Sequence, residues 1–143
     1  IIAVCLFVFI VTNDYFARRI RTLFLISCAM IVGLVVADSV EYWCASRNTF
    51  TPLRTLTSAI GYSLRPFIIY MVILLLTRQK SKMDKWLAIP LVINAMIAFS
   101  AFFTDIAYSY TMDNQFVRGP IGYFVFVTSG LYEIVLFIYA ITV

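Results

Sequence analysis

The chain has 143 residues and a formal net charge of +4, yet only 13% of its residues are charged and 63% are hydrophobic. Soluble domains contain about 25% charged and about 45–50% apolar residues, so this composition excludes an ordinary soluble domain. The apolar residues form long blocks, as in membrane-spanning helices, and the basic residues lie between the blocks. That placement indicates membrane topology, so we expect the lipid bilayer as a partner and no nucleic acid.

The apolar blocks predict a single all-α domain, a polytopic membrane bundle of about five transmembrane helices. The short connections make successive helices antiparallel neighbours. The chain begins without Met and ends inside an apolar run, so we expect a fragment of a longer protein, with part of its function outside these residues. The five spans are expected at about residues 1–11, 23–44, 55–77, 86–104 and 120–143.

The connections differ in their content of Lys and Arg. The first and third carry three and four basic residues, whereas the second and fourth carry two and one. The positive-inside rule places the richer connections in the cytoplasm. We therefore expect a multi-pass protein of the inner (plasma) membrane, with the N-terminus outside and the C-terminus cytoplasmic.

Four ionisable residues fall inside the predicted spans: Asp38, Glu41, Arg65 and Glu133. A charge at a helix centre costs about 2.5–3.5 kcal/mol on insertion scales, so such residues usually face the bundle interior and have partners. At ~1.5 Å of rise per residue, Asp38 and Arg65 lie about 10 and 15 Å from the outer ends of adjacent helices. This predicts an ion pair. Glu133 lies deeper without an evident partner, and a packed carboxyl and a functional one remain equally open.

Further polar residues share the helix faces of this predicted pair. Glu41 and Tyr42 follow Asp38 by three and four residues, and Tyr62 precedes Arg65 by three, so each lies on the face of its charged neighbour. Together they predict a polar cavity that opens to the outside and receives a small molecule. The alternative is that the ion pair only fixes helix packing.

The fourth span contains Asn94, whose usual role is an interhelical hydrogen bond. Catalytic and metal-binding patterns are missing. The sequence has no His, its three cysteines (Cys5, Cys28 and Cys44) show no CxxC spacing, and no phosphate loop is present. We expect no catalytic residue, no metal and no cofactor in this segment.

Three segments carry a family resemblance: residues 61–70 (GYSLRPFIIY), 89–94 (IPLVIN) and 114–123 (NQFVRGPIGY). In this order they resemble the N-terminal multi-helix sensor region of bacterial diguanylate cyclases, chiefly of Gram-positive bacteria. They are also similar to membrane-sensor regions of some histidine kinases. The resemblance covers about residues 19–132. It implies a cytoplasmic output domain that dimerises and makes cyclic di-GMP from two GTP molecules; the segment itself lacks the GG[DE]EF motif.

In the last of these segments, Gly119 and Pro120 predict a turn into the fifth helix, with Pro in the first turn, where its missing N–H does no harm. Arg118 would then lie at the outer mouth of the bundle. An anionic ligand and a lipid headgroup are equally open as its partner.

We therefore expect a homodimeric membrane sensor in which a ligand from the outer side shifts the fifth helix and so controls the output domain. Such a ligand must bind the two states with different affinity. A small transporter or channel subunit and a passive membrane anchor are the alternatives. The candidate ligand-binding or switch residues are Asp38, Glu41, Tyr42, Tyr62, Arg65 and Arg118, and the candidate buried polar residues are Asn94 and Glu133.

Overall fold

The computed structural model describes residue 8 and residues 18–47, 51–77 and 82–142. These residues form four long helices and one β-hairpin. In chain order the elements are α2 (Arg18–Arg47), α3 (Thr51–Leu76), α4 (Lys82–Ser100), β1 (Tyr108–Tyr110), β2 (Phe116–Arg118) and α5 (Phe124–Thr142). The span expected at residues 1–11 lies outside the described residues, apart from residue 8.

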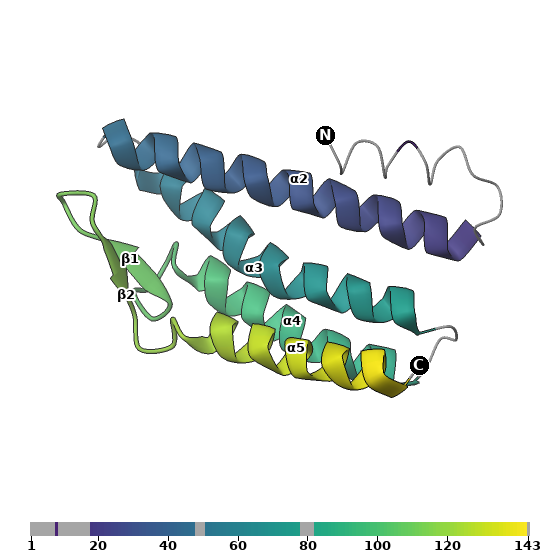
Figure 1. The fold of residues 1–143 in the computed structure, drawn as a ribbon. Helices are drawn as coiled ribbons and strands as arrows, with labels where there is room; N and C mark the ends of the chain where they lie inside the picture. The colour runs from purple at the N-terminus through teal and green to yellow at the C-terminus, as the bar shows by residue number, and fades with distance from the viewer. Residues whose placement is uncertain (1–7, 9–17, 48–50, 78–81, 143) are drawn as a thin grey trace.

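Successive helices run antiparallel, as the short connections predicted (Figure 1). Helix α3 lies at the centre and packs against α2, α4 and α5, whereas α2 packs chiefly against α3. The start of α2 and the end of α3 lie at one end of the bundle, where the Arg19 guanidinium donates a hydrogen bond of 3.3 Å to the Thr77 carbonyl. The hairpin lies at the opposite end, which we call the hairpin end.

Three helices are long and apolar enough to cross a membrane: α2, residues 52–76 of α3, and α5. The apolar part of α4, Lys85–Ser100, is shorter. Large apolar side chains cover the outer surfaces of these helices, as expected for segments that contact lipid; Val32 of α2 and Phe137 of α5 are examples. The class of protein thus agrees with the composition: a helical protein with three helices that are long and apolar enough to span a membrane.

The apolar core joins α3, α4 and α5. Tyr70 and Ile73 of α3 pack with Leu91 of α4 and Tyr132 of α5. The rings of Tyr70 and Tyr132 meet edge to face with centroids 6.2 Å apart, and the Tyr132 hydroxyl donates a hydrogen bond to the Leu87 carbonyl. Both tyrosines therefore bury their rings, and the hydroxyl of Tyr132 is satisfied.

Asn94 satisfies a backbone group that a proline leaves open. Proline has no N–H, so Pro66 cannot donate to the carbonyl of Tyr62 four residues earlier in α3. The side-chain amide of Asn94, in α4, donates to that carbonyl at 2.9 Å. The side chain of Asn94 is almost fully buried, which makes this bond a fixed link between α3 and α4. The interhelical role predicted for Asn94 is confirmed.

The fourth connection differs most from the prediction. Helix α4 ends at Ser100 rather than near residue 104, and α5 begins at Phe124 rather than near residue 120, so the connection is longer than expected. It contains the hairpin, which was not predicted. Pro120 therefore lies in a turn before α5 and not in its first turn.

Two glycines explain why the helix begins so late. The N–H of Gly119 bonds to the Ala107 carbonyl, and the N–H of Ile121 bonds to the Ile106 carbonyl, each at 3.0 Å. A Cβ on Gly119 or on Gly122 would lie 2.3 Å from backbone oxygens of residues 105–107. The backbone of this segment thus runs directly against the chain that enters the hairpin, and only glycine permits that approach.

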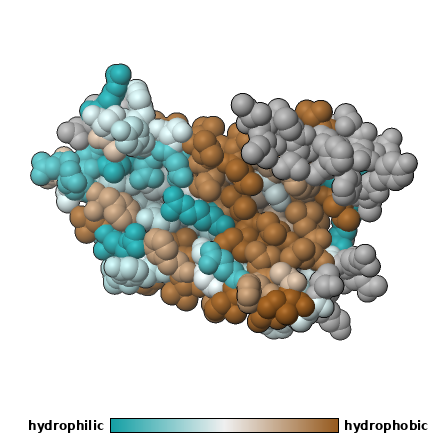
Figure 2. Space-filling model, viewed as in Figure 1, coloured by the Kyte–Doolittle hydropathy of each residue, from teal (hydrophilic) through white to brown (hydrophobic). Residues whose placement is uncertain are grey.

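The strands pair antiparallel, with Tyr108 opposite Arg118 and Tyr110 opposite Phe116. The hairpin fills a space beside the longer helices. Because α2 and α3 have 30 and 26 residues and α4 and α5 have 19 each, the first pair is ~10–16 Å longer at ~1.5 Å per residue. Figure 2 shows hydrophilic surface gathered at the hairpin end and apolar surface over the rest of the helices.

Candidate ligand-binding site

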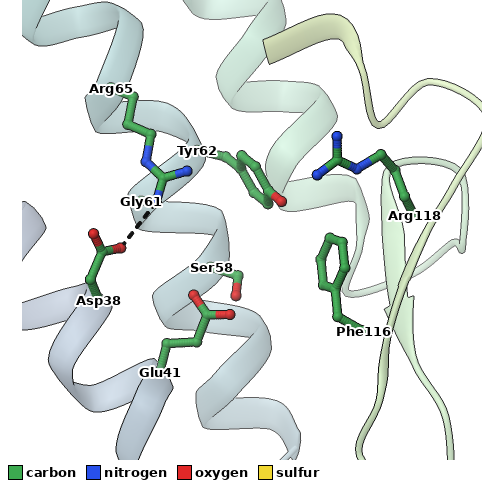
Figure 3. Close-up of a pocket in the computed structure, with 8 residues that line it drawn as sticks. All are labelled: Asp38, Glu41, Ser58, Gly61, Tyr62, Arg65, Phe116 and Arg118. Atoms are coloured by element: carbon green, nitrogen blue, oxygen red, sulfur yellow. Dashed lines mark hydrogen bonds and ion pairs between the residues drawn. The ribbon is translucent and has the colours of Figure 1, made fainter. Parts of the chain in front are cut away.

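A cavity of about 240 Å³ lies at the hairpin end, between α2, α3 and the hairpin. Both carboxylates that line it come from α2, and one guanidinium comes from each of the other two walls (Figure 3). Its lining residues are Asp38, Glu41, Ser58, Gly61, Tyr62, Arg65, Phe116 and Arg118.

The predicted ion pair between Asp38 and Arg65 is present, with 3.3 Å between the carboxylate oxygen and the guanidinium nitrogen. Gly61 lies beside the pair, and a Cβ at that position would lie 3.4 Å from the Asp38 carboxylate, which is an ordinary contact distance. The side chains of Arg65 and Asp38 are 45% and 47% exposed, so they face the cavity mouth rather than a closed interior. An exposed pair adds at most about 1 kcal/mol, so a ligand can replace it at little cost.

The second carboxylate joins a hydrogen-bonded group on the hairpin. The Tyr110 hydroxyl donates to the Glu41 carboxylate at 3.4 Å, and its oxygen lies 2.6 Å from the Ser58 hydroxyl. Burial raises the pKa of the Tyr110 phenol to about 12, and this outweighs the lowering by Ser58. Tyr110 therefore stays protonated at neutral pH and remains a donor to Glu41.

Arg118 forms the opposite wall. Its guanidinium lies 5.7 Å from the ring centre of Phe116, 4.9 Å from that of Tyr123 and 4.7 Å from that of Phe126. In the close-up it points toward the hydroxyl end of Tyr62 (Figure 3). The aromatic rings hold the cation in place by cation–π attraction without neutralising it.

A buried arginine anchors the hairpin against the helices. Arg54, in the first turns of α3, donates to the carbonyl of Asn114 and, at 2.9 Å, to its side-chain oxygen. The guanidinium also lies 4.3 Å from the ring centre of Tyr110. The Asn114 amide donates in turn to the Cys44 carbonyl of α2 at 3.3 Å. One side chain of the hairpin loop thus ties the tips of both long helices together.

Asn114 also sets the shape of that loop. Its φ of 57° is in the left-handed region, which Asn tolerates better than most residues. Its N–H bonds to the Thr111 carbonyl at 2.9 Å. The Tyr108 hydroxyl adds a second anchor, a 2.9 Å bond to the Thr55 carbonyl.

Five of the six predicted ligand-binding residues line the cavity: Asp38, Glu41, Tyr62, Arg65 and Arg118. The sixth, Tyr42, lies outside it. Its side chain is 78% exposed and borders a shallow depression on the outer face of α2. It is four residues from Asp38 but is not among the residues that line the cavity, so the prediction that it does so was wrong.

Glu133 is exposed on α5, so among the described residues no other element packs over it. Within the described residues it has no hydrogen-bond or ion-pair partner.

Sequence reasoning missed Phe116 in the lining, and Arg54, Tyr110 and Asn114 behind it. The sequence does contain a pattern typical of a hairpin. Two short segments with aromatic and β-branched residues, Tyr-Ser-Tyr and Phe-Val-Arg, flank a loop that contains Asp-Asn. Arg54 was counted only as a loop charge, because nothing in its spacing indicates that it turns inward.

No family model matches the chain, and the comparisons with curated proteins and with solved structures found no significant match either.

Proposed function

We propose that this chain is the membrane-embedded sensor domain of a signalling protein and that the cavity at the hairpin end receives the signal. The observation that carries the proposal is the cavity itself. It places opposite charges from α2, α3 and the hairpin around one open space at the polar end of an otherwise apolar bundle. Intramembrane charges arranged around a cavity indicate a functional site.

The distribution of basic residues supports an outward-facing cavity. Arg18, Arg19 and Arg21 begin α2, and Lys82 and Lys85 begin α4, all at the end opposite the hairpin. By the positive-inside rule that end is cytoplasmic. The hairpin end then faces the outside, and α5 runs from the cavity toward the cytoplasm.

Arg118 links the cavity to α5, because its side chain contacts both. Its guanidinium lines the cavity and also lies against Tyr123, directly before α5, and Phe126, in the first turn of α5. A ligand that draws Arg118 into the cavity would loosen these contacts and favour a different position of α5. Since α5 leads toward the cytoplasm, this displacement would reach an output domain there, which we propose to be a diguanylate cyclase.

Glu133 supports a homodimer formed through α5. A carboxyl on the lipid-facing side of a spanning helix is costly unless it meets another polypeptide. Gly130, one turn away, has open space where a Cβ would be, so a second helix can approach closely. In such a dimer, a shift of α5 changes how two output domains meet.

The test compares the natural protein that contains this chain with a version in which an unrelated helical anchor replaces residues 1–143. Cyclic di-GMP formation from GTP is measured for both in the same lipid. We expect the replacement to change the rate and to remove its response to extracts that contain the signal. Equal rates and responses would show that the bundle is a passive anchor. If the folded natural protein made no cyclic di-GMP, the proposed diguanylate cyclase would be refuted.

A further inference from the structure

The cavity offers one negative and one positive group that do not neutralise each other. Of its four charged residues, Asp38 and Arg65 form an ion pair. Within the described residues neither Glu41 nor Arg118 has an ion-pair partner. Glu41 accepts only the long bond from Tyr110, and Arg118 meets aromatic rings and the Tyr62 hydroxyl, which is neutral. An unpaired charge that is partly withdrawn from water is stabilised when a ligand brings the opposite charge.

These two groups lie on different walls. Glu41 comes from α2 and Arg118 from the hairpin, with Tyr62 between them (Figure 3). A ligand that is only anionic would be attracted by Arg118 and repelled by Glu41, and a ligand that is only cationic would meet the reverse. A molecule with both charges satisfies both walls.

The size and lining set further limits. A cavity of about 240 Å³ is smaller than the roughly 300–1,000 Å³ of sites for drug-sized molecules. The rings of Phe116 and Tyr62, whose centres lie 6.5 Å apart, give it an apolar side. The Ser58 hydroxyl is a further polar group. The site therefore suits a compact molecule with two charges and at most a short apolar part.

We infer that the ligand is a small zwitterion, with an ammonium group held at Glu41 and an acidic group held at Arg118. The inference rests on the proposed function in taking the cavity as a site of ligand binding. Two sources supply this chemistry: a free amino acid from the outer solution, and the zwitterionic headgroup of a lipid in the outer leaflet. Binding at both ends draws Arg118 toward Glu41 and away from the start of α5.

The experiment uses the natural full-length protein in nanodiscs of phosphatidylglycerol. The thermal unfolding midpoint is measured with each of the twenty standard amino acids in turn, and with propionate and ethylamine, the singly charged halves of alanine. A second arm adds phosphatidylethanolamine to the nanodisc. The variants are Glu41→Gln and Arg118→Gln, with Asp113→Asn and Arg47→Gln as exposed controls at the same end.

We expect a saturable rise of the midpoint with at least one amino acid, or with phosphatidylethanolamine, and none with propionate or ethylamine. Loss of one charged contact should weaken binding about ten- to a hundredfold in Glu41→Gln and in Arg118→Gln, but not in the controls. The amide of Glu41→Gln still accepts from Tyr110, so this variant should fold. If Arg118→Gln does not fold, Arg118→Lys keeps the charge and should bind at reduced affinity.

The zwitterion is overturned if neither arm gives a saturable rise, if propionate or ethylamine acts as well as the amino acid, or if the two variants bind normally. Cyclic di-GMP output, measured in parallel, separates this failure from failure of the sensor. Binding without a change of output would refute the sensor and keep the ligand class. A change of output caused by a probe with one charge would refute the zwitterion as the ligand class and keep the sensor.

Discussion

The two ends of the bundle are held together by different forces. Away from the hairpin, α3, α4 and α5 meet through Tyr70, Ile73, Leu91 and Tyr132, while most large apolar side chains face outward. At the hairpin end, hydrogen bonds and cation–π contacts join the tips of α2 and α3 to a loop. Apolar packing has many equivalent contacts, whereas each polar contact depends on one partner, so the hairpin end is where single substitutions and ligands should act most strongly.

The largest effect should follow from Arg54→Leu. It leaves two oxygens of Asn114 without their donor, and each buried group left unpaired costs about 1–3 kcal/mol. We expect hydrogen exchange of the amides in residues 108–118 to accelerate about a hundredfold, a loss of about 3 kcal/mol. Arg47→Leu, at an exposed position of the same end, is the control. Unchanged protection of the hairpin would contradict the anchoring role of Arg54.

Asn94→Leu tests the polar link between α3 and α4. It removes the donor to the Tyr62 carbonyl, and interhelical bonds of this kind contribute about 1–2 kcal/mol. The free energy of unfolding in mixed detergent micelles should fall by that amount. In a Pro66→Ala background the helix regains its own donor to this carbonyl, so Asn94→Leu should cost less there. Equal costs in the two backgrounds would show that Asn94 acts in some other way.

Asp38→Asn and Arg65→Gln should hardly change stability. Both side chains are nearly half exposed, and such pairs contribute about 0–1 kcal/mol. Each variant should nevertheless alter the response of cyclic di-GMP synthesis to the signal, because both side chains line the cavity. An unchanged response in both would remove the ion pair from the mechanism.

The last effect concerns pH. Burial raises the pKa of Tyr110 to about 12, above the value near 10 of an exposed tyrosine. The unfolded state therefore loses its proton first, and the stability due to Tyr110 is complete below pH ~10 and is lost as the pH rises to ~12. Unfolding measured from pH 9 to 12 should show this decline in the natural protein and a weaker one in Tyr110→Phe. Identical slopes would contradict the buried position of the phenol.

The two ends also differ in how much the sequence reveals. Long apolar blocks predict α2, α3 and α5 directly, since length and hydropathy suffice to indicate a spanning helix. The Asp38–Arg65 pair followed from depth along two antiparallel helices, a calculation that needs only the rise per residue.

The hairpin end was harder to predict, because contacts between residues about sixty positions apart determine it. Arg54 and Asn114 meet only when the hairpin folds back on α3, and neither position carries a local pattern that says so. Tyr42 was misplaced because helical spacing groups residues on one face but does not give the direction of each side chain. Gly119 looks like a helix-entry residue in the sequence, yet its role, like that of Gly122, is close contact with the backbone of residues 105–107.

The central claim is that a signal received at the cavity reaches α5 through Arg118. The most direct test is the rate of cyclic di-GMP synthesis by the full-length natural protein carrying Arg118→Gln, compared with Arg47→Gln, with and without the ligand found in the nanodisc assay. The account predicts that Arg118→Gln synthesises at one rate in both conditions, while Arg47→Gln responds as the natural protein does. A normal response in Arg118→Gln would contradict it.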